Sequence, residues 1–161
     1  MSTLVETMGI GVAAVPVDTT GAAVTGDYVS LKNYSHLTVI ITQGAWAAGT
    51  PAVTMKQATD VSNSASDEKA LEIDYYWTKT GLTGTAFTKT AITSDTFNLT
   101  ATANTITVLE IDASDLDSDG GFDCVRLGIA SPGANADLIS AVYILSGARY
   151  SNADMGDAKA D

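Results

Sequence analysis

The stretch Ala70-Leu-Glu-Ile-Asp-Tyr-Tyr-Trp-Thr-Lys79 decides the predicted fold class, because apolar and polar side chains alternate along it. One set of alternate positions is large and apolar: Leu71, Ile73, Tyr75 and Trp77. The other set holds Glu72, Asp74 and Tyr76. Successive side chains of a β-strand point to opposite faces of the sheet. The pattern therefore predicts one strand over residues 70–79, with the first set in the core and Tyr76 on the exposed face.

Segments rich in Thr, Val and Ile recur along the chain, separated by Gly, Asn and Asp. β-branched side chains fit pleated sheets, and turn signals about every 8–12 residues are typical of a sandwich or barrel. Further strands are predicted over 11–17, 27–32, 36–42, 52–59, 87–92, 96–100, 105–112, 122–130 and 138–146. We expect an all-β fold, an antiparallel β-sandwich of jelly-roll type with about 8–9 strands and no long helix. Residues 138–146 are apolar on both faces, which predicts a central strand covered on both sides.

The 161 residues fit one domain. We expect a single β-sandwich domain over residues 1–150, with 1–11 as a possible extended N-terminal arm. Residues 151–161 have Met155 as their one bulky apolar residue, which predicts a flexible C-terminal tail. The apolar runs fall far short of the roughly 20 residues that span a bilayer, and the start of the chain does not read as a signal peptide. We therefore expect no membrane segment and synthesis in a cytoplasm.

Acidic residues outnumber basic ones by 19 to 8, for a formal net charge of −11. Nucleic-acid binding draws most of its affinity from Lys and Arg side chains that neutralise phosphates. The charge therefore predicts that the chain does not bind DNA or RNA directly. An acidic surface also keeps a protein soluble at high concentration.

An acidic segment, Asp115-Leu-Asp117-Ser-Asp119-Gly120, matches the start of a calcium-binding loop, and Asp123 follows at the ninth position. Position twelve is Arg126, where a bidentate glutamate is expected, and the sequence predicts no flanking helices beyond one turn over 113–116. The interpretation we favour is a solvated turn whose carboxylates accept bonds from their own backbone. Calcium held by Asp115, Asp117, Asp119 and Asp123 is the alternative, and otherwise we expect neither cofactor nor metal.

Residues that could support catalysis are few. A thiol nucleophile at Cys124 needs a paired base, and the chain's one histidine, His36, lies in a different predicted strand. Glu72 and Asp74 point the same way along their strand, as a glycosidase pair would, yet such pairs arise by chance in so acidic a chain. Phosphate-binding loops and nucleophile elbows are absent from the sequence. We predict that the protein is not an enzyme and that Cys124 fills space in the sheet.

Two aromatic residues are candidates for a partner interface. Trp46 lies in Gln43-Gly-Ala-Trp-Ala-Ala-Gly49, which predicts a flexible loop carrying one large side chain. Tyr76 is predicted to be exposed by the alternation around it. Aromatic side chains of this kind form interface hot spots or stack on sugars, whereas packing in the core is the plainer alternative.

Four segments together resemble small structural proteins of tailed bacteriophages: Gly44-Ala-Trp-Ala-Ala-Gly-Thr-Pro-Ala-Val-Thr-Met-Lys-Gln-Ala-Thr-Asp60, Leu109-Glu-Ile-Asp-Ala-Ser-Asp-Leu-Asp117, Gly121-Phe-Asp-Cys-Val-Arg126 and Leu145-Ser-Gly-Ala-Arg-Tyr150. The resemblance extends over roughly residues 28–150 and includes no catalytic motif. It implies a jelly-roll head decoration (cement) protein on the outer capsid surface of a virion. It carries no binding residue over to a particular position.

The resemblance implies the major capsid protein as partner. Self-association is also expected, as a homotrimer or another homo-oligomer, because it would cover sheet edges. Two other functions stay open at this point. One is a structural protein of the tail or baseplate, and the other is a carbohydrate-binding β-sandwich module that uses Trp46 and Tyr76.

Overall fold

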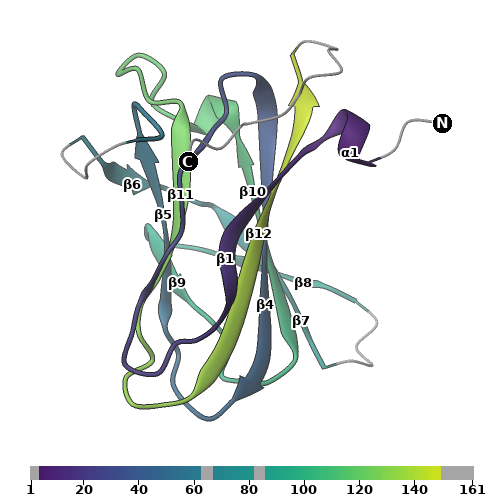
Figure 1. The fold of residues 1–161 in the computed structure, drawn as a ribbon, viewed down its shortest axis with the longest axis vertical. Coiled ribbons are helices and arrows are strands. Elements are labelled where there is room, and N and C mark those ends of the chain that lie inside the picture. The colour runs from purple at the N-terminus through teal and green to yellow at the C-terminus, as the bar shows by residue number, and fades with distance from the viewer. Residues whose placement is uncertain (1–3, 63–66, 82–85, 150–161) are drawn as a thin grey trace.

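The computed structural model describes residues 4–62, 67–81 and 86–149 (Figure 1). Within these residues the elements are α1 (Leu4–Thr7), β1 (Gly9–Asp18), β2 (Val24–Thr25), β3 (Val29–Ser30), β4 (Tyr34–Trp46), β5 (Ala52–Ala58), β6 (Lys69–Leu71), β7 (Tyr75–Thr80), β8 (Thr88–Ala91), β9 (Thr96–Asn98), β10 (Thr105–Asp112), the 3₁₀ turn η1 (Ala113–Asp115), β11 (Cys124–Ile129) and β12 (Asp137–Ala148). The predicted all-β class is confirmed. In the described part of the chain, the longest helix has four residues.

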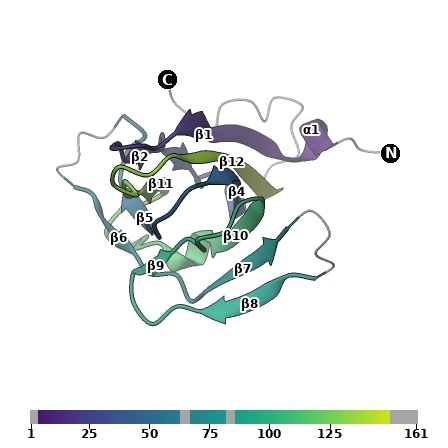
Figure 2. The ribbon, with the colours of Figure 1, turned by 90° about the horizontal axis from the view of Figure 1, so that it is seen from below.

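Two antiparallel sheets face each other across one core. Sheet A has the order β1-β12-β4-β10-β7-β8. Sheet B has the order β2-β11-β5-β6, with β3 also paired to β11 and β9 also paired to β5. Figure 2 shows the two layers end-on, with β11, β5 and β9 on one side and β12, β4 and β10 on the other.

The topology is that of a jelly roll once two interrupted strands are joined. β2 and β3 both pair with β11, and β6 and β9 both pair with β5 in the same antiparallel direction. Joining each pair leaves eight strands outside the β7–β8 hairpin. The first, eighth, third and sixth then form one sheet, and the second, seventh, fourth and fifth form the other. This alternation between sheets is the jelly-roll arrangement, so the predicted type is confirmed.

The predicted single strand over residues 70–79 is wrong. β6 ends at Leu71 in sheet B, and β7 begins at Tyr75 in sheet A. After β6 the chain leaves the strand beside β5, β7 and β8 pair at the edge of sheet A, and β9 again pairs with β5 (Figure 1). The N–H of Ile92 donates to the carbonyl oxygen of Asp74 at 2.8 Å and closes the base of this excursion.

The change of sheet also alters which residues face the core. Leu71 and Ile73 are buried, as predicted. Tyr75 is exposed, and Trp77 pairs with Val108 on the outer face of sheet A. Tyr76 instead packs against the core. The alternation rule holds within one strand, and it fails here because the chain crosses between sheets at residues 72–74.

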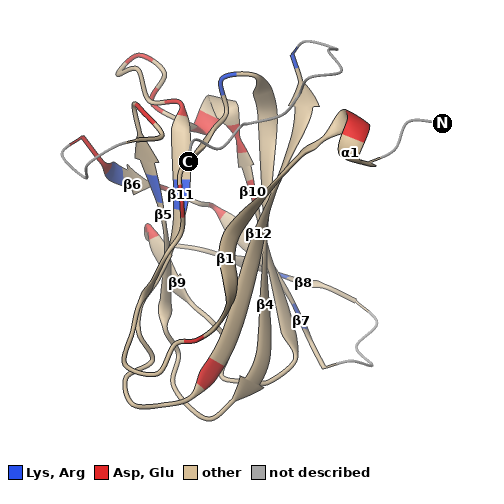
Figure 3. Ribbon diagram, viewed as in Figure 1, with Lys and Arg blue, Asp and Glu red and all other residues tan. Residues whose placement is uncertain are grey.

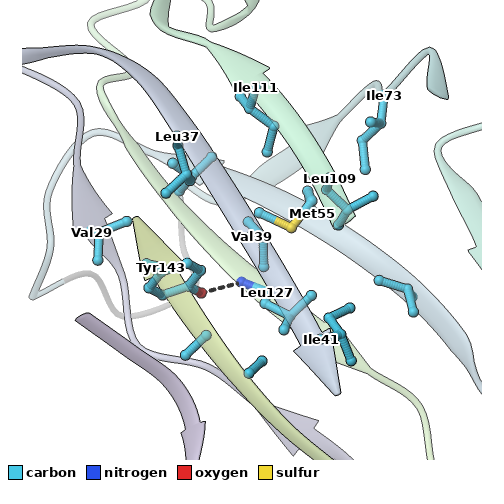
Figure 4. Close-up of a cluster of buried hydrophobic side chains, with 14 of the residues drawn as sticks. Val29, Leu37, Val39, Ile41, Met55, Ile73, Leu109, Ile111, Leu127 and Tyr143 are labelled. Atoms are coloured by element: carbon cyan, nitrogen blue, oxygen red, sulfur yellow. Dashed lines mark hydrogen bonds between the residues drawn. The ribbon is translucent and has the colours of Figure 1, made fainter. Parts of the chain in front are cut away.

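The core fills the space between the sheets with alternate residues of the long strands (Figure 4). Leu37, Val39 and Ile41 of β4 are fully buried, as predicted. The same holds for Val125 and Leu127 of β11. Since each buried aliphatic side chain contributes about 1.5–3 kcal/mol, these rows hold the two sheets together.

A tyrosine completes the hydrogen bonding where β2 and β3 part. Tyr143 of β12 is 0% exposed, and its hydroxyl accepts the backbone N–H of Leu127 in β11 at 2.7 Å (Figure 4). Gly26 lies in the same gap, and a Cβ there would stand 2.8 Å from the carbonyl oxygen of Ala13 and 2.9 Å from the Tyr143 hydroxyl. The interruption of the strand therefore depends on a glycine and on a hydroxyl from the opposite sheet.

The two ends of the chain differ in how far they can be described. Residues 9–11 belong to β1 and residues 4–7 to α1, so the possible extended arm over residues 1–11 is wrong for these positions. The predicted tail over residues 151–161 lies outside the described residues. Among the described residues, no helix is long and apolar enough to cross a membrane.

Candidate interaction surface

The outer face of sheet A is apolar across five strands. The ladder registers place five side chains in one row: Val12 of β1, Val142 of β12, Ile40 of β4, Val108 of β10 and Trp77 of β7. Val12 is 47% exposed and Val142 is 37% exposed. We call this row and its apolar neighbours Ile10, Ile106, Leu138 and Ile144 the sheet A patch. A solvated face of an antiparallel sheet is ordinarily polar, so the patch departs from the usual pattern.

The sequence carries a signal for this patch in the apolar run of residues 138–146. Residues 138–146 were predicted to be covered on both sides because they are apolar at every position. β12 is indeed an inner strand, between β1 and β4, yet Leu138 and Val142 are exposed. The apolar residues on both sides of β12 thus indicate an outer face that no other part of the described chain covers.

Charged groups lie around the sheet A patch rather than within its central row. Glu110 lies at one end of β10, and Lys79 and Lys89 lie on the β7–β8 hairpin. Asp112 and His36 form a further charged pair at the same end of the face, and the outward positions next to the central row include the uncharged residues Thr38, Thr42 and Ser140. In Figure 3 the middle lengths of β1, β12 and β4 are free of charged residues, while acidic residues gather near the end of the sandwich that carries α1.

The outer face of sheet B is charged, in contrast. Arg126 of β11 lies directly opposite Lys56 of β5, a pairing of like charges that would repel. Glu68, which is 11% exposed, lies between them. Its carboxylate accepts the Arg126 Nε–H at 2.7 Å and lies 3.6 Å from the Lys56 ammonium. The Tyr28 hydroxyl donates to the same carboxylate at 2.5 Å.

The electrostatics of this network keep Glu68 ionised. Burial acts to raise the pKa of Glu68, but hydrogen bonds from Tyr28 and Arg126 outweigh it and leave the pKa below its ordinary value. Burial, together with the bond to Glu68, raises the pKa of Tyr28 to about 12. The network is satisfied internally and holds β3, β5 and β11 in register.

His36 is held between two carboxylates at one end of sheet A. Its Nδ1 lies 2.7 Å from an oxygen of Asp112, and its Nε2 lies 2.6 Å from an oxygen of Glu110. The Thr38 hydroxyl also donates to Glu110 at 2.7 Å. Burial acts to lower the pKa of His36, but the bonds to Asp112 and Glu110 outweigh it and raise the pKa above its ordinary value. The imidazolium form thus bridges the two acidic side chains.

An acidic hollow of about 380 Å³ lies beside this cluster, between β10 and the β7–β8 hairpin. Its charged lining residues are Glu72, Asp74, Glu110, Asp112 and Asp115, and Trp77 contributes an aromatic wall. Glu72 and Asp74 are neighbours in the sequence. They lie close to Glu110 and Asp112 of β10 because the chain passes from sheet B to sheet A at residues 72–74. The hollow is an electronegative feature at the margin of the sheet A patch.

The acidic segment 115–123, for which calcium was the alternative interpretation, is a turn whose carboxylates accept hydrogen bonds from nearby groups of the chain. Asp117 accepts the Gly120 N–H at 3.0 Å and forms an ion pair with Lys69. Asp115 accepts the Asp112 N–H at 2.9 Å, and Asp123 accepts the Cys124 thiol at 2.9 Å. Over the ranges that the structure describes, no three His, Cys, Asp or Glu side chains come together as a metal would need. Asp119 is a further acidic residue of the same turn.

Cys124 and His36 do not meet. Cys124 lies on β11 of sheet B and is buried with Tyr28 and Ala58 in a small cluster outside the main core. His36 lies on the outer face of sheet A. Burial and the neighbouring Asp123 raise the pKa of the Cys124 thiol to about 12, so the thiol is protonated at neutral pH.

The two aromatic candidates both turn toward the protein interior. Trp46 belongs to β4 rather than to a flexible loop, and its indole N–H donates to the Gly49 carbonyl oxygen at 3.0 Å. Tyr76 stacks on Phe97, with 4.2 Å between the ring centroids. Each is half-buried against the core, so the predicted exposed positions of Trp46 and Tyr76 are wrong. Trp77, which sequence reasoning assigned to the core, is the aromatic side chain in the row of the sheet A patch.

Comparison with known proteins assigns no family. No protein-family model matches the chain, and no curated protein matches it. The solved structures that match include the crystal structure of SPBc2 prophage-derived protein YomS, with a TM-score of 0.44 and 9% sequence identity. That match covers 86% of this chain and 93% of the YomS chain. A similarity of this strength assigns neither family nor function to the chain.

Proposed function

We propose that this protein is a non-enzymatic structural protein of a tailed-bacteriophage virion that decorates the outer surface of the head. Its partner is the major capsid protein, and its role is to stabilise the shell. The single observation that carries the proposal is the sheet A patch, an apolar area without charge in its central row, on a sandwich whose other face is charged and internally bonded. A protein built in this way presents one face to other proteins and the remainder to water.

The chemistry of the candidate catalytic residues supports binding over catalysis. Cys124 is buried as a protonated thiol, and both ring nitrogens of His36 are bonded to carboxylates. A nucleophile needs a base within hydrogen-bond reach, and these two residues lie on different sheets. Decoration of a capsid lattice also needs only modest affinity for each contact, because linked copies bind a repeating surface with high avidity.

The resemblance of the four sequence segments to phage structural proteins supports the virion location. A structural protein of the tail or baseplate would use the same kind of surface and would differ from a head decoration protein only in its location on the virion. The carbohydrate-binding function loses support because Trp46 and Tyr76 both pack inward.

The test is binding of the purified protein to expanded head shells of the phage whose genome encodes it. We expect saturable, stoichiometric binding, and decorated shells should withstand a higher temperature than bare shells before they rupture. Isolated tails serve as the comparison particle. Binding to tails alone would establish the tail function, and shells that neither bind the protein nor gain stability would contradict the decoration role.

A further inference from the structure

The sheet A patch has the composition of a surface that identical subunits share. Interfaces between permanently associated copies are more apolar than transient interfaces, which resemble the remaining protein surface. The row from Val12 through Val142, Ile40 and Val108 consists of β-branched aliphatic side chains in direct cross-strand register. Such a row exposes flat apolar surface with few polar groups to satisfy.

The size of the patch reaches the lower range of stable interfaces. Strands lie about 4.8 Å apart and rise about 3.4 Å per residue, so five strands by about seven residues give roughly 24 Å by 24 Å, or roughly 600 Å². This rectangle also contains the polar residues Thr38, Thr42 and Ser140 and, at its margins, Lys79 and Glu110. Two such faces bury about 1,200 Å², the lower limit for specific interfaces.

The distribution of charge permits a second copy to pack on the patch. Two chains with a net charge of −11 repel each other, so they can associate only where each presents a surface without acidic groups. The central row meets that condition, and its rim carries both Lys79 and Lys89 on one hairpin and Glu110 at the end of β10. Copies related by a two-fold axis can therefore bring apolar centres together while their acidic ends remain in solvent.

The geometry points to a face-to-face homodimer in which the outer faces of two sheets A pack against each other through Val12, Val142, Ile40 and Val108. Two sheets that stack in this way lie about 10 Å apart, with side chains interdigitating as in a sandwich core. This inference rests on the proposed function and names the chain that covers the patch: the decorating unit is a dimer joined through the outer faces of its two sheets A.

The experiment is sedimentation equilibrium of the free protein, without capsids, over a wide concentration range. We expect the wild type to have twice the chain mass of 16.6 kDa. Val142→Lys places a charge in the centre of the row and should give a monomer, and Val12→Lys at the exposed edge strand should weaken association in the same direction. Asn98→Lys adds the same charge on the outside of β9 in sheet B and should leave the dimer intact. Circular dichroism checks that each variant remains folded.

A wild-type protein that is monomeric at every concentration would overturn the inference, as would an oligomer that Val142→Lys leaves unchanged. Shell binding separates this outcome from failure of the proposed function. A dimer that dissociates on Val142→Lys but does not bind shells supports the inference and contradicts the decoration role. A monomeric wild type whose shell binding is lost in Val142→Lys supports decoration through the patch and overturns the dimer.

Discussion

Replacement of Tyr143 by Phe tests whether the hydroxyl that spans the sandwich is needed for stability. The Tyr143 hydroxyl accepts the Leu127 N–H at 2.7 Å, and both residues are 0% exposed. Phenylalanine keeps the ring and its packing but leaves the N–H without that partner. A buried backbone donor that loses its acceptor costs about 1–3 kcal/mol of stability.

The expected thermal shift follows from this free energy. For a domain of 150–250 residues, each kcal/mol lowers Tm by about 2–4 °C, so a loss of about 2 kcal/mol gives a decrease of roughly 4–8 °C. The assay is thermal and urea unfolding of both proteins at one fixed concentration, because association makes Tm depend on concentration. The midpoint in urea should fall while the slope stays constant.

The control is Tyr76→Phe, which also removes one hydroxyl and keeps the ring that stacks on Phe97. Its stability should stay within about 0.5 kcal/mol of the wild type. If Tyr143→Phe is equally neutral, then the Leu127 N–H finds another partner and the reasoning about the interrupted strand is refuted.

Three further predictions concern charge and the thiol. Glu68→Gln should cost about 1–3 kcal/mol in urea unfolding at neutral pH, because it leaves Arg126 beside Lys56 without its charged hydrogen-bond partner. Since folding lowers the pKa of Glu68, the stability advantage of the wild type should be present above the unfolded pKa and fade as pH falls through the folded pKa. A difference in stability that persists in acid would contradict this. His36→Gln tests the opposite dependence of stability on pH. Because folding raises the pKa of His36, its protonated side chain stabilises the fold below about pH 6.5, the unfolded pKa, and this contribution is lost as pH rises through the folded pKa. The wild type and the variant should therefore converge in stability at alkaline pH. Cys124 should react with a thiol reagent such as DTNB only after unfolding, because the thiol is buried with a pKa of about 12, and fast reaction of the native protein would show that its cover opens.

The strand pattern was predictable because most strands are long enough for their periodicity to show which face is buried. The prediction for residues 105–112 matches β10, and those for 36–42 and 52–59 fall on β4 and β5. Alternation of Val125, Leu127 and Ile129 also placed Cys124 correctly on the side away from the core. These are local properties, since one strand needs only its own side chains to show an apolar face.

The interaction surface was not predictable in the same way. Registers between strands far apart in sequence place Val12, Val142, Ile40 and Val108 in one row. Local sequence context predicts Trp46 and Tyr76 as interface anchors, whereas in the folded protein both pack against the core. The apolar outer side of residues 138–146 was visible in the sequence, but nothing local shows whether a second layer covers it.

The amino-acid sequence alone determined that this chain forms strands, that their apolar sides build a sandwich, and that its acidity disfavours phosphate binding. Tertiary structure alone decided that residues 70–79 divide between two sheets, that Glu68 reaches Arg126, and that one outer face stays apolar and open. The physical reason is that side-chain alternation is set within a single strand, whereas pairing partners, registers and uncovered faces depend on which distant segments come to lie side by side.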